Sequence, residues 1–262
     1  MILTFTDFGS NGPYRGQMHA VLIKDAPGHP VLDLMVDAPS FDPKASSYLL
    51  AALLGPLPKD AVVVAVVDPD VGGPRLPMIV RAHGHWIVGP DNGLMEIASR
   101  QAGAGSWRID WRPQNLSATF HGRDLFAPVA ARLATGAVPE DMECSPHGLT
   151  ACPDWPDDLA EVIYVDGYGN AMTGYRAQSA DVLWSIEFMG RMIHHAPRFG
   201  AAPRGQPFWY ANSSGLVEIA MNGDSASQRL GLGIGSRFNW CSEPDVMKPS
   251  MPGDVRFDVN HC

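Results

Sequence analysis

The sequence predicts an α/β N-terminal domain with a mostly parallel central sheet, followed by an all-β, barrel-like C-terminal domain. The first observation is the run VVVAVV at 62–67, which lacks polar alternation and is therefore typical of a strand buried on both faces. The second is the alternation of strand-like and helix-like segments over about the first 140 residues. The third is the near disappearance of helical patterns beyond residue 158.

Each element of the first domain has a local signal. Apolar residues recur at helical spacing between Tyr14 and Lys24, and Pro43 and Gly55 bound an apolar helix. His83-Gly84-His85 separates two apolar runs, which favours a hairpin. The expected elements are strands at 2–6, 31–36 and 62–67, a hairpin of 78–82 and 86–88, and helices at 14–24, 44–54, 123–133 and from about 94 to 102.

A proline-rich stretch separates the two expected domains. Residues 144–158, CSPHGLTACPDWPDD, contain three prolines and are typical of a linker. We therefore expect an α/β domain over 1–150 and a β-domain over 158–262. Within the second domain, Gly, Asn and Asp separate short strand candidates, which favours a small antiparallel barrel or sandwich. These candidates lie at 159–165, 183–188, 208–211, 216–221 and 237–240.

Charge and cysteine content limit the possible partners. The chain has 262 residues, a formal net charge of −9 and a pI near 5.4, which argues against nucleic acid and anionic membranes as partners. An acidic chain suits a cationic ligand or a metal. The four cysteines form no CxxC pair, and neither a signal peptide nor a membrane span is recognisable. We expect a cytoplasmic protein with reduced thiols.

Charged side chains gather where the predicted strands end. Asp7 follows the first strand, Asp68 the central strand and Asp91 the hairpin, and such ends converge on one crevice in an open α/β sheet. Arg75 and His121 are the further candidates for this site. Taken singly, each has a structural interpretation as well: Asp68-Pro69 is typical of a turn, and His121 of a core histidine.

Two loops stand out in the second domain. They are DGYGN at 166–170 and NSSGLVEIA at 212–220. They are either two tight turns or a rim of amide, hydroxyl, aromatic and acidic groups suited to a nucleoside or an amino acid. The histidine pairs at 83 and 85 and at 194 and 195 have no carboxylate or cysteine at ligand spacing, so we expect no metal there.

Six motifs together resemble the S-adenosyl-L-methionine (SAM) hydroxide adenosyltransferase family, whose members are also called SAM hydrolases. Fluorinase and chlorinase are its halide-using relatives. The resemblance covers nearly the whole chain, and the motifs occur in the order of that family. They are TDFG at 6–9, VVDPDVG at 66–72 with Arg75, GPDNGL at 89–94, TFHGRD at 119–124, DGYGN at 166–170 and NSSGLVEIA at 212–220.

The resemblance implies a reaction and an assembly. Water would displace methionine from the 5′ carbon of SAM, giving adenosine and L-methionine without cofactor or metal. The family implies a homotrimer whose SAM sites lie between the N-terminal domain of one subunit and the C-terminal domain of the next. The resemblance also implies site residues: catalytic Asp68, Arg75 and His121, and substrate-binding Asp7, Asp166, Tyr168, Asn170 and Ser213.

Several points stay open at this stage. His121 could accept the proton of the water, or the Arg75–Asp68 pair could lower the pKa of the water. Asp70 stands where the family commonly has Gly, which adds a charge near Asp68. The alternatives are a halide-using SAM halogenase, a metal-dependent phosphatase or nucleosidase with Asp7, Asp68 and Asp91 as ligands, and a non-catalytic SAM- or adenosine-binding module. The resemblance implies that halogenases lack the His and Arg combination of His121-Gly122-Arg123, which favours hydrolysis.

Overall fold

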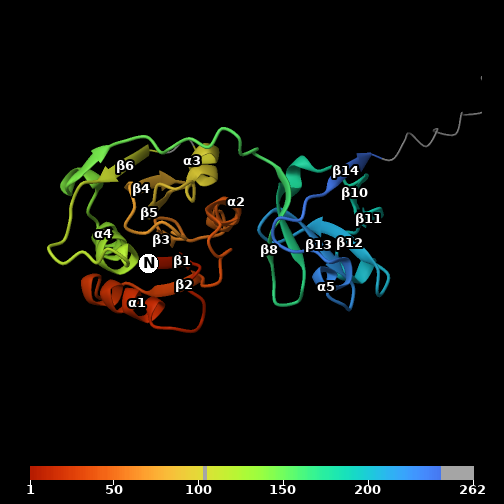
Figure 1. The fold of residues 1–262 in the computed structure, drawn as a ribbon, viewed down its shortest axis with the longest axis horizontal. Coiled ribbons are helices and arrows are strands. Elements are labelled where there is room, and N and C mark those ends of the chain that lie inside the picture. Colours follow the sequence, from red (N-terminus) through yellow and green to blue (C-terminus); the bar gives the residue numbers. More distant parts are fainter. Residues whose placement is uncertain (103–104, 243–262) are drawn as a thin grey trace, which may run out of the picture.

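The computed structural model describes residues 1–102 and 105–242 of the chain. It contains two seven-stranded sheets, one in each half of the chain, joined by a segment without regular structure near residue 150 (Figure 1). The last part of the expected second domain, 243–262, lies outside the described residues, and Cys262 with it. Cys144, Cys152 and Cys241 are free thiols. No helix in the described part of the chain has the length and apolar character needed to cross a membrane.

The N-terminal sheet is mixed rather than mostly parallel, so that part of the sequence prediction was wrong. Its strand order is β2-β1-β3-β5-β4-β6-β7. Neighbouring strands are parallel from β2 to β5 and antiparallel from β5 to β7. The strands are β1 (Ile2–Thr6), β2 (Val31–Met35), β3 (Val62–Val66), β4 (Pro77–Ala82), β5 (His85–Pro90), β6 (Gly105–Ile109) and β7 (Cys144–Pro146).

The change of direction begins at the β4–β5 turn. Ala82 pairs with His85, so His83 and Gly84 alone form the loop, and their φ angles of 52° and 81° are both positive. Positive φ at both central residues defines the tight turn whose twist suits a hairpin. A loop this short can only join antiparallel strands, because a parallel pair needs a long crossover.

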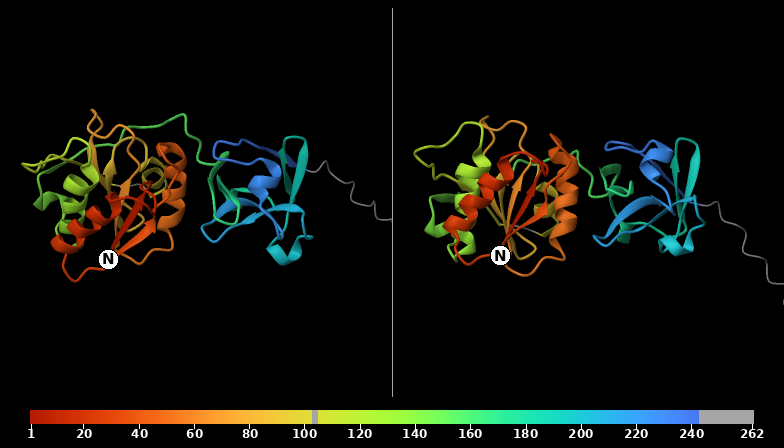
Figure 2. Two further views of the ribbon diagram at one scale, coloured as in Figure 1. Left: turned by 60° about the horizontal axis from the view of Figure 1, so that its bottom comes forward. Right: turned by 90° about the horizontal axis from the view of Figure 1, so that it is seen from below.

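Helices cover both faces of this sheet (Figure 2). Val63, Ala65 and Val67 pack in one core with α2 (Pro43–Leu54) and α3 (Glu96–Ala102). Val62, Val64 and Val66 pack in the other core with α1 (Tyr14–Asp25) and α4 (Ala127–Ala134). Alternate side chains of β3 thus enter two different cores, which explains why the strand is apolar at every position.

The C-terminal sheet curves into a half-barrel, and two features depart from the expected all-β, antiparallel domain. Strands β11 and β12 are parallel, and α5 (Ala226–Leu230) packs on the sheet. Ser225 caps this short helix by accepting from the Gln228 N–H, and Gly231 ends it in the left-handed conformation. The strand order is β14-β10-β11-β12-β13-β9-β8. The strands are β8 (Leu159–Val165), β9 (Ala171–Arg176), β10 (Trp184–Phe188), β11 (Arg191–His195), β12 (Pro207–Ala211), β13 (Leu216–Met221) and β14 (Asn239–Ser242).

The segment between the two sheets is bound to the first domain. Arg100 of α3 donates from Nη1 to the Trp155 carbonyl at 2.8 Å and to Asp157 at 3.0 Å. The Tyr48 hydroxyl of α2 donates to the Pro156 carbonyl. These bonds satisfy backbone carbonyls of a proline-rich segment that has few regular partners of its own.

Candidate active site

Asp68, Arg75 and His121 form one hydrogen-bonded group. Arg75 donates from Nε to both oxygens of Asp68, at 2.9 and 3.1 Å, and from Nη2 to Oδ2 as well. Its Nη2 also donates to Nδ1 of His121 at 2.9 Å. The Arg75 and Asp68 side chains are only 8% and 4% exposed, so this is a buried, two-pronged ion pair.

The bond from Arg75 fixes the protonation state of His121. A guanidinium can only donate, so Nδ1 of His121 must accept, and the neutral ring carries its proton on Nε2. Burial and the adjacent Arg75 charge lower the pKa of His121 below its ordinary value. His121 is therefore a neutral imidazole at pH 7, with an Nε2–H donor.

A cavity of about 570 Å³ lies beside this group. Asp7, Asp68 and His121 line it, whereas Arg75 lies behind them and faces a separate surface hollow. An aromatic cluster forms part of the wall: the rings of Tyr14 and Phe120 meet edge to face with centroids 5.3 Å apart, and Phe8 contacts both. The cavity thus combines two carboxylates and an imidazole with an aromatic wall.

Local backbone features hold the catalytic candidates in place. Asp68 lies just beyond β3, and His121 directly precedes the π-helical turn η1 (Gly122–Phe126), a conformation frequent at functional sites. Gly72 has φ +84°, and a Cβ there would lie 2.3 Å from the Ala118 carbonyl oxygen. The loop that bears Arg75 therefore packs directly on the backbone near His121, which only Gly permits.

Asp7 lies at the same cavity, at the end of β1. The backbone N–H of Phe41 donates to Asp7 Oδ2 at 3.3 Å. Burial raises the pKa of the Asp7 carboxyl, and the nearby Asp68 charge adds to that rise. Phe41 lines the cavity, is 77% exposed and has a positive φ of 59°. Left-handed backbone is rare for a bulky residue, and such strain gathers at ligand sites.

Asp91 does not join this group. Its oxygens accept from the backbone N–H of Thr150 at 3.0 and 3.2 Å and from the Thr150 hydroxyl at 2.9 Å. The Asp91 side chain holds the segment between the domains. The expectation that Asp91 joins Asp7 and Asp68 in one site was therefore wrong. The reason is topological: Asp91 follows β5 but turns toward residues that approach from beyond β7. Residues 1–102 and 105–242 hold no group of three or more His, Cys, Asp or Glu placed to bind a metal.

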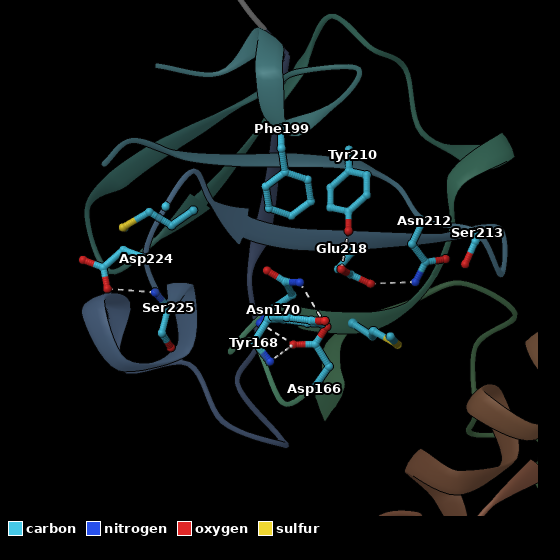
Figure 3. Close-up of a pocket in the computed structure, with 13 residues that line it drawn as sticks. Asp166, Tyr168, Asn170, Phe199, Tyr210, Asn212, Ser213, Glu218, Asp224 and Ser225 are labelled. Carbon is cyan, nitrogen blue, oxygen red and sulfur yellow. Dashed lines mark hydrogen bonds between the residues drawn. The ribbon is translucent and has the colours of Figure 1, made fainter. Parts of the chain in front are cut away.

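The candidate residues of the second domain line another cavity, of about 810 Å³ (Figure 3). Asp166 accepts from the backbone N–H groups of Tyr168 and Asn170, both at 2.9 Å, and from the Asn170 amide at 3.0 Å. The DGYGN loop is thus closed around its own carboxylate. Tyr168 is 85% exposed at the rim, and Ser213 lines the same cavity.

Sequence reasoning assigned no role to three of the residues that line this cavity, Glu218, Phe199 and Tyr210. Glu218 is buried on β13 and accepts from the Tyr210 hydroxyl and from Asn212 Nδ2, the latter at 2.8 Å. Phe199 and Tyr210 pack edge to face against each other, with centroids 5.5 Å apart. The sequence did contain a signal for Glu218. It is an acid inside the apolar run LVEIA, and a buried strand rarely contains an unpaired acid.

The two cavities share no lining residue and belong to different sheets. The protein thus has a two-domain fold: an α/β sheet with a carboxylate, arginine and imidazole group at its strand ends, and a half-barrel with a second polar cavity. The family follows from comparison with known proteins.

Two family models match the chain in succession. They describe the SAM hydroxide adenosyltransferase N-terminal domain, over residues 2–143, and C-terminal domain, over residues 160–239. This chain therefore belongs to the SAM hydroxide adenosyltransferase family, which confirms the resemblance inferred from the six motifs.

Individual relatives agree with the family. The chain is 38% identical to (R)-S-adenosyl-L-methionine hydrolase of Thermus thermophilus, over 87% of this chain and 94% of the relative. It is 36% identical to the protein of the same name from Salinispora arenicola, over 89% and 94%. A crystal structure of an uncharacterized conserved protein from Thermotoga maritima superposes with a TM-score of 0.84 and 27% identity, covering 92% of this chain and all of that chain.

Proposed function

We propose that this protein hydrolyses SAM: water attacks the ribose 5′ carbon, and adenosine and L-methionine are released. Family membership and the two named relatives support the reaction. The observation that carries the proposal is the Asp68–Arg75–His121 group at the wall of the first cavity, because it offers a donor and a carboxylate to a water molecule. By analogy with these relatives, the substrate is the (R) epimer at sulfur.

For this reaction the protein mainly has to position the water and the C5′ atom of SAM. The water oxygen forms a bond to C5′, the C5′–S bond breaks, and its electron pair neutralises the sulfonium to give the thioether of methionine. One proton leaves the water. Because the sulfonium already activates C5′, we propose an in-line displacement without a metal, driven by the placement of water and carbon in near-attack geometry.

The hydrogen bonds suggest a role for each residue. His121 holds the attacking oxygen through its Nε2–H, because Nδ1 is occupied by Arg75. Asp68 accepts the proton of the water, because Nε2 of His121 already carries a proton and cannot accept another. Arg75 does not line the cavity and acts as a positioning residue for both. Asp7 would hold the ribose hydroxyls.

The second cavity would bind the rest of SAM. Asp166 and Asn170 suit the methionine end, Ser213 its carboxylate, and the exposed Tyr168 a packing contact on the ligand. Since the two cavities share no residue, we propose that the complete site forms between the first domain of one subunit and the second domain of the next, in a cytoplasmic homotrimer.

Isotope transfer tests the reaction. The pure protein is incubated with the (R) epimer of SAM in 18O-labelled water with a chelator present, and the products are analysed by mass spectrometry. Label at the 5′ oxygen of adenosine, with unlabelled methionine, is the expected result. Unchanged SAM would overturn the proposal in favour of a binding module, and 5′-halogenated adenosine in the presence of halide would identify a halogenase. Activity that requires an added divalent ion would contradict the metal-free displacement.

A further inference from the structure

Glu218 carries a buried charge in the second cavity. Glu218 is only 2% exposed, yet it lines the cavity from β13, where it lies between Tyr210 and Asn212 (Figure 3). Both of its oxygens accept hydrogen bonds, one from the Tyr210 hydroxyl and one from Asn212 Nδ2. Acceptance at both oxygens, with no donation, is the bonding pattern of an ionised carboxylate.

The charge of Glu218 has no cationic partner. None of the salt bridges among the described residues includes it. Burial raises the pKa of Glu218, and the neighbouring Asp166 adds to the rise, whereas the bonds from Tyr210 and Asn212 oppose it. A buried carboxylate is costly unless it is paired, so a cation in the cavity would relieve this cost.

The other acids of the cavity are already compensated. Asp166 accepts three hydrogen bonds from its own loop. Asp224 is exposed at the rim and forms a salt bridge of 2.6 Å with Arg229. Glu218 is therefore the acid of this cavity whose field is least screened, because it is both buried and unpaired.

We propose that Glu218 is a specificity-determining residue that makes the site prefer a cationic sulfonium ligand over a neutral thioether of nearly the same shape. The inference rests on the proposed function and names what distinguishes the substrate. SAM carries one positive charge more than S-adenosyl-L-homocysteine, and the two otherwise differ by one methyl group. A charge several Å from the cation, in a partly desolvated cavity, suffices for roughly a tenfold difference in affinity.

A purely structural role makes a different prediction. Asn212 accepts from the backbone N–H groups of Ser214 and Leu216, both at 3.0 Å, so Glu218 also orients the amide that holds this loop. Loss of the loop would weaken the binding of SAM and of the thioether equally. The ratio of the two dissociation constants thus separates the effect of charge from the effect of positioning.

The experiment measures both dissociation constants by calorimetry, in a His121→Ala background so that SAM persists. For Glu218→Gln we expect the Kd of SAM to rise about tenfold and that of S-adenosyl-L-homocysteine to change less than about twofold. The matched control Asp224→Asn removes a paired, exposed charge of the same cavity and should leave the ratio unchanged. Equal weakening of both ligands, or no weakening of either, would overturn the inference.

A second variant keeps the test decisive if Glu218→Gln fails to fold. Tyr210→Phe removes a donor that opposes the raised pKa of Glu218, so it is assayed at mildly alkaline pH, where the carboxyl stays ionised and the variant should keep at least the wild-type preference for SAM. Loss of that preference would contradict the inference. The wild-type protein is assayed for adenosine release from SAM in parallel: an inactive wild type would overturn the proposed function, whereas the binding ratio would still decide the role of Glu218.

Discussion

Arg75 and His121, 46 residues apart in the sequence, are joined by a hydrogen bond of 2.9 Å from Nη2 to Nδ1. The same guanidinium binds Asp68 through two nitrogens. One buried cation thus pairs with the carboxylate and fixes the tautomer of the imidazole. In the proposed mechanism this arrangement assigns the two roles that the sequence left open to different residues: His121 donates to the water, and Asp68 accepts its proton.

Loss of the imidazole should slow the chemical step more than binding. For His121→Ala we expect kcat to fall roughly 100-fold or more, because the donor that holds the water is absent. The Kd of SAM should change less than about threefold. Rapid-quench measurement of adenosine checks the rate, and calorimetry checks the binding. A wild-type kcat in this variant would contradict the role of His121.

Arg75→Lys tests the geometry of the guanidinium rather than its charge. An ammonium cannot form the fork to Asp68 and reach Nδ1 of His121 at the same time, so kcat should fall at least about tenfold. The substitution is preferable to Arg75→Ala, which would leave Asp68 buried without its partner and cost about 3–5 kcal/mol of stability. Thermal unfolding of Arg75→Lys serves as the control. Unchanged kcat would show that positive charge alone suffices.

The rate should depend on pH through His121. Burial and Arg75 lower the pKa of His121 below its ordinary value of 6.5, so the neutral ring persists at neutral pH. As pH falls through that lowered pKa, a proton adds to Nδ1 and the bond from Arg75 is lost. At saturating SAM we expect kcat to be constant above pH 6.5 and to decline only below it. A decline that begins well above pH 6.5 would contradict the proposed tautomer.

The subunit arrangement can be tested by complementation. His121→Ala disables the first cavity and Asp166→Asn the second, so each variant alone should have low activity. If sites form between neighbouring subunits, co-refolding the two variants should regenerate some sites with both wild-type cavities and restore activity. Light scattering should give the mass of a trimer. If every site formed within one chain, mixing would restore nothing.

Gly72 offers a stability test at the site. Gly72→Ala combines positive φ with a Cβ 2.3 Å from the Ala118 carbonyl oxygen, whereas Gly28→Ala has positive φ of 81° with no atom within 4 Å. The control, Gly28→Ala, should lower the free energy of unfolding by about 1 kcal/mol. Gly72→Ala should cost at least about 1 kcal/mol more and lower kcat, because the loop that bears Arg75 must shift. Equal losses in chemical denaturation would contradict this close packing.

The sequence by itself determined the family, the first-domain layers and the candidates at the first cavity. The unbroken run at 62–67 implied burial on both faces, and its alternate residues do enter two separate cores. Asp7 and Asp68 follow neighbouring parallel strands, and parallel strands end at the same edge of a sheet. Local sequence therefore contained enough to bring these two carboxylates to one cavity.

Only the tertiary structure decided the direction of the later strands and the surroundings of the polar side chains. The β4–β5 hairpin was recognisable in the sequence, but the antiparallel pairing of β4 with β6 and of β6 with β7 joins residues far apart in the chain, which no local pattern encodes. Asp91 looked like Asp68 in the sequence, but a bond to Thr150 removes it from the site. Arg75 lies behind the cavity, and Glu218 inside one, because burial and hydrogen bonding are set by residues far away in the chain.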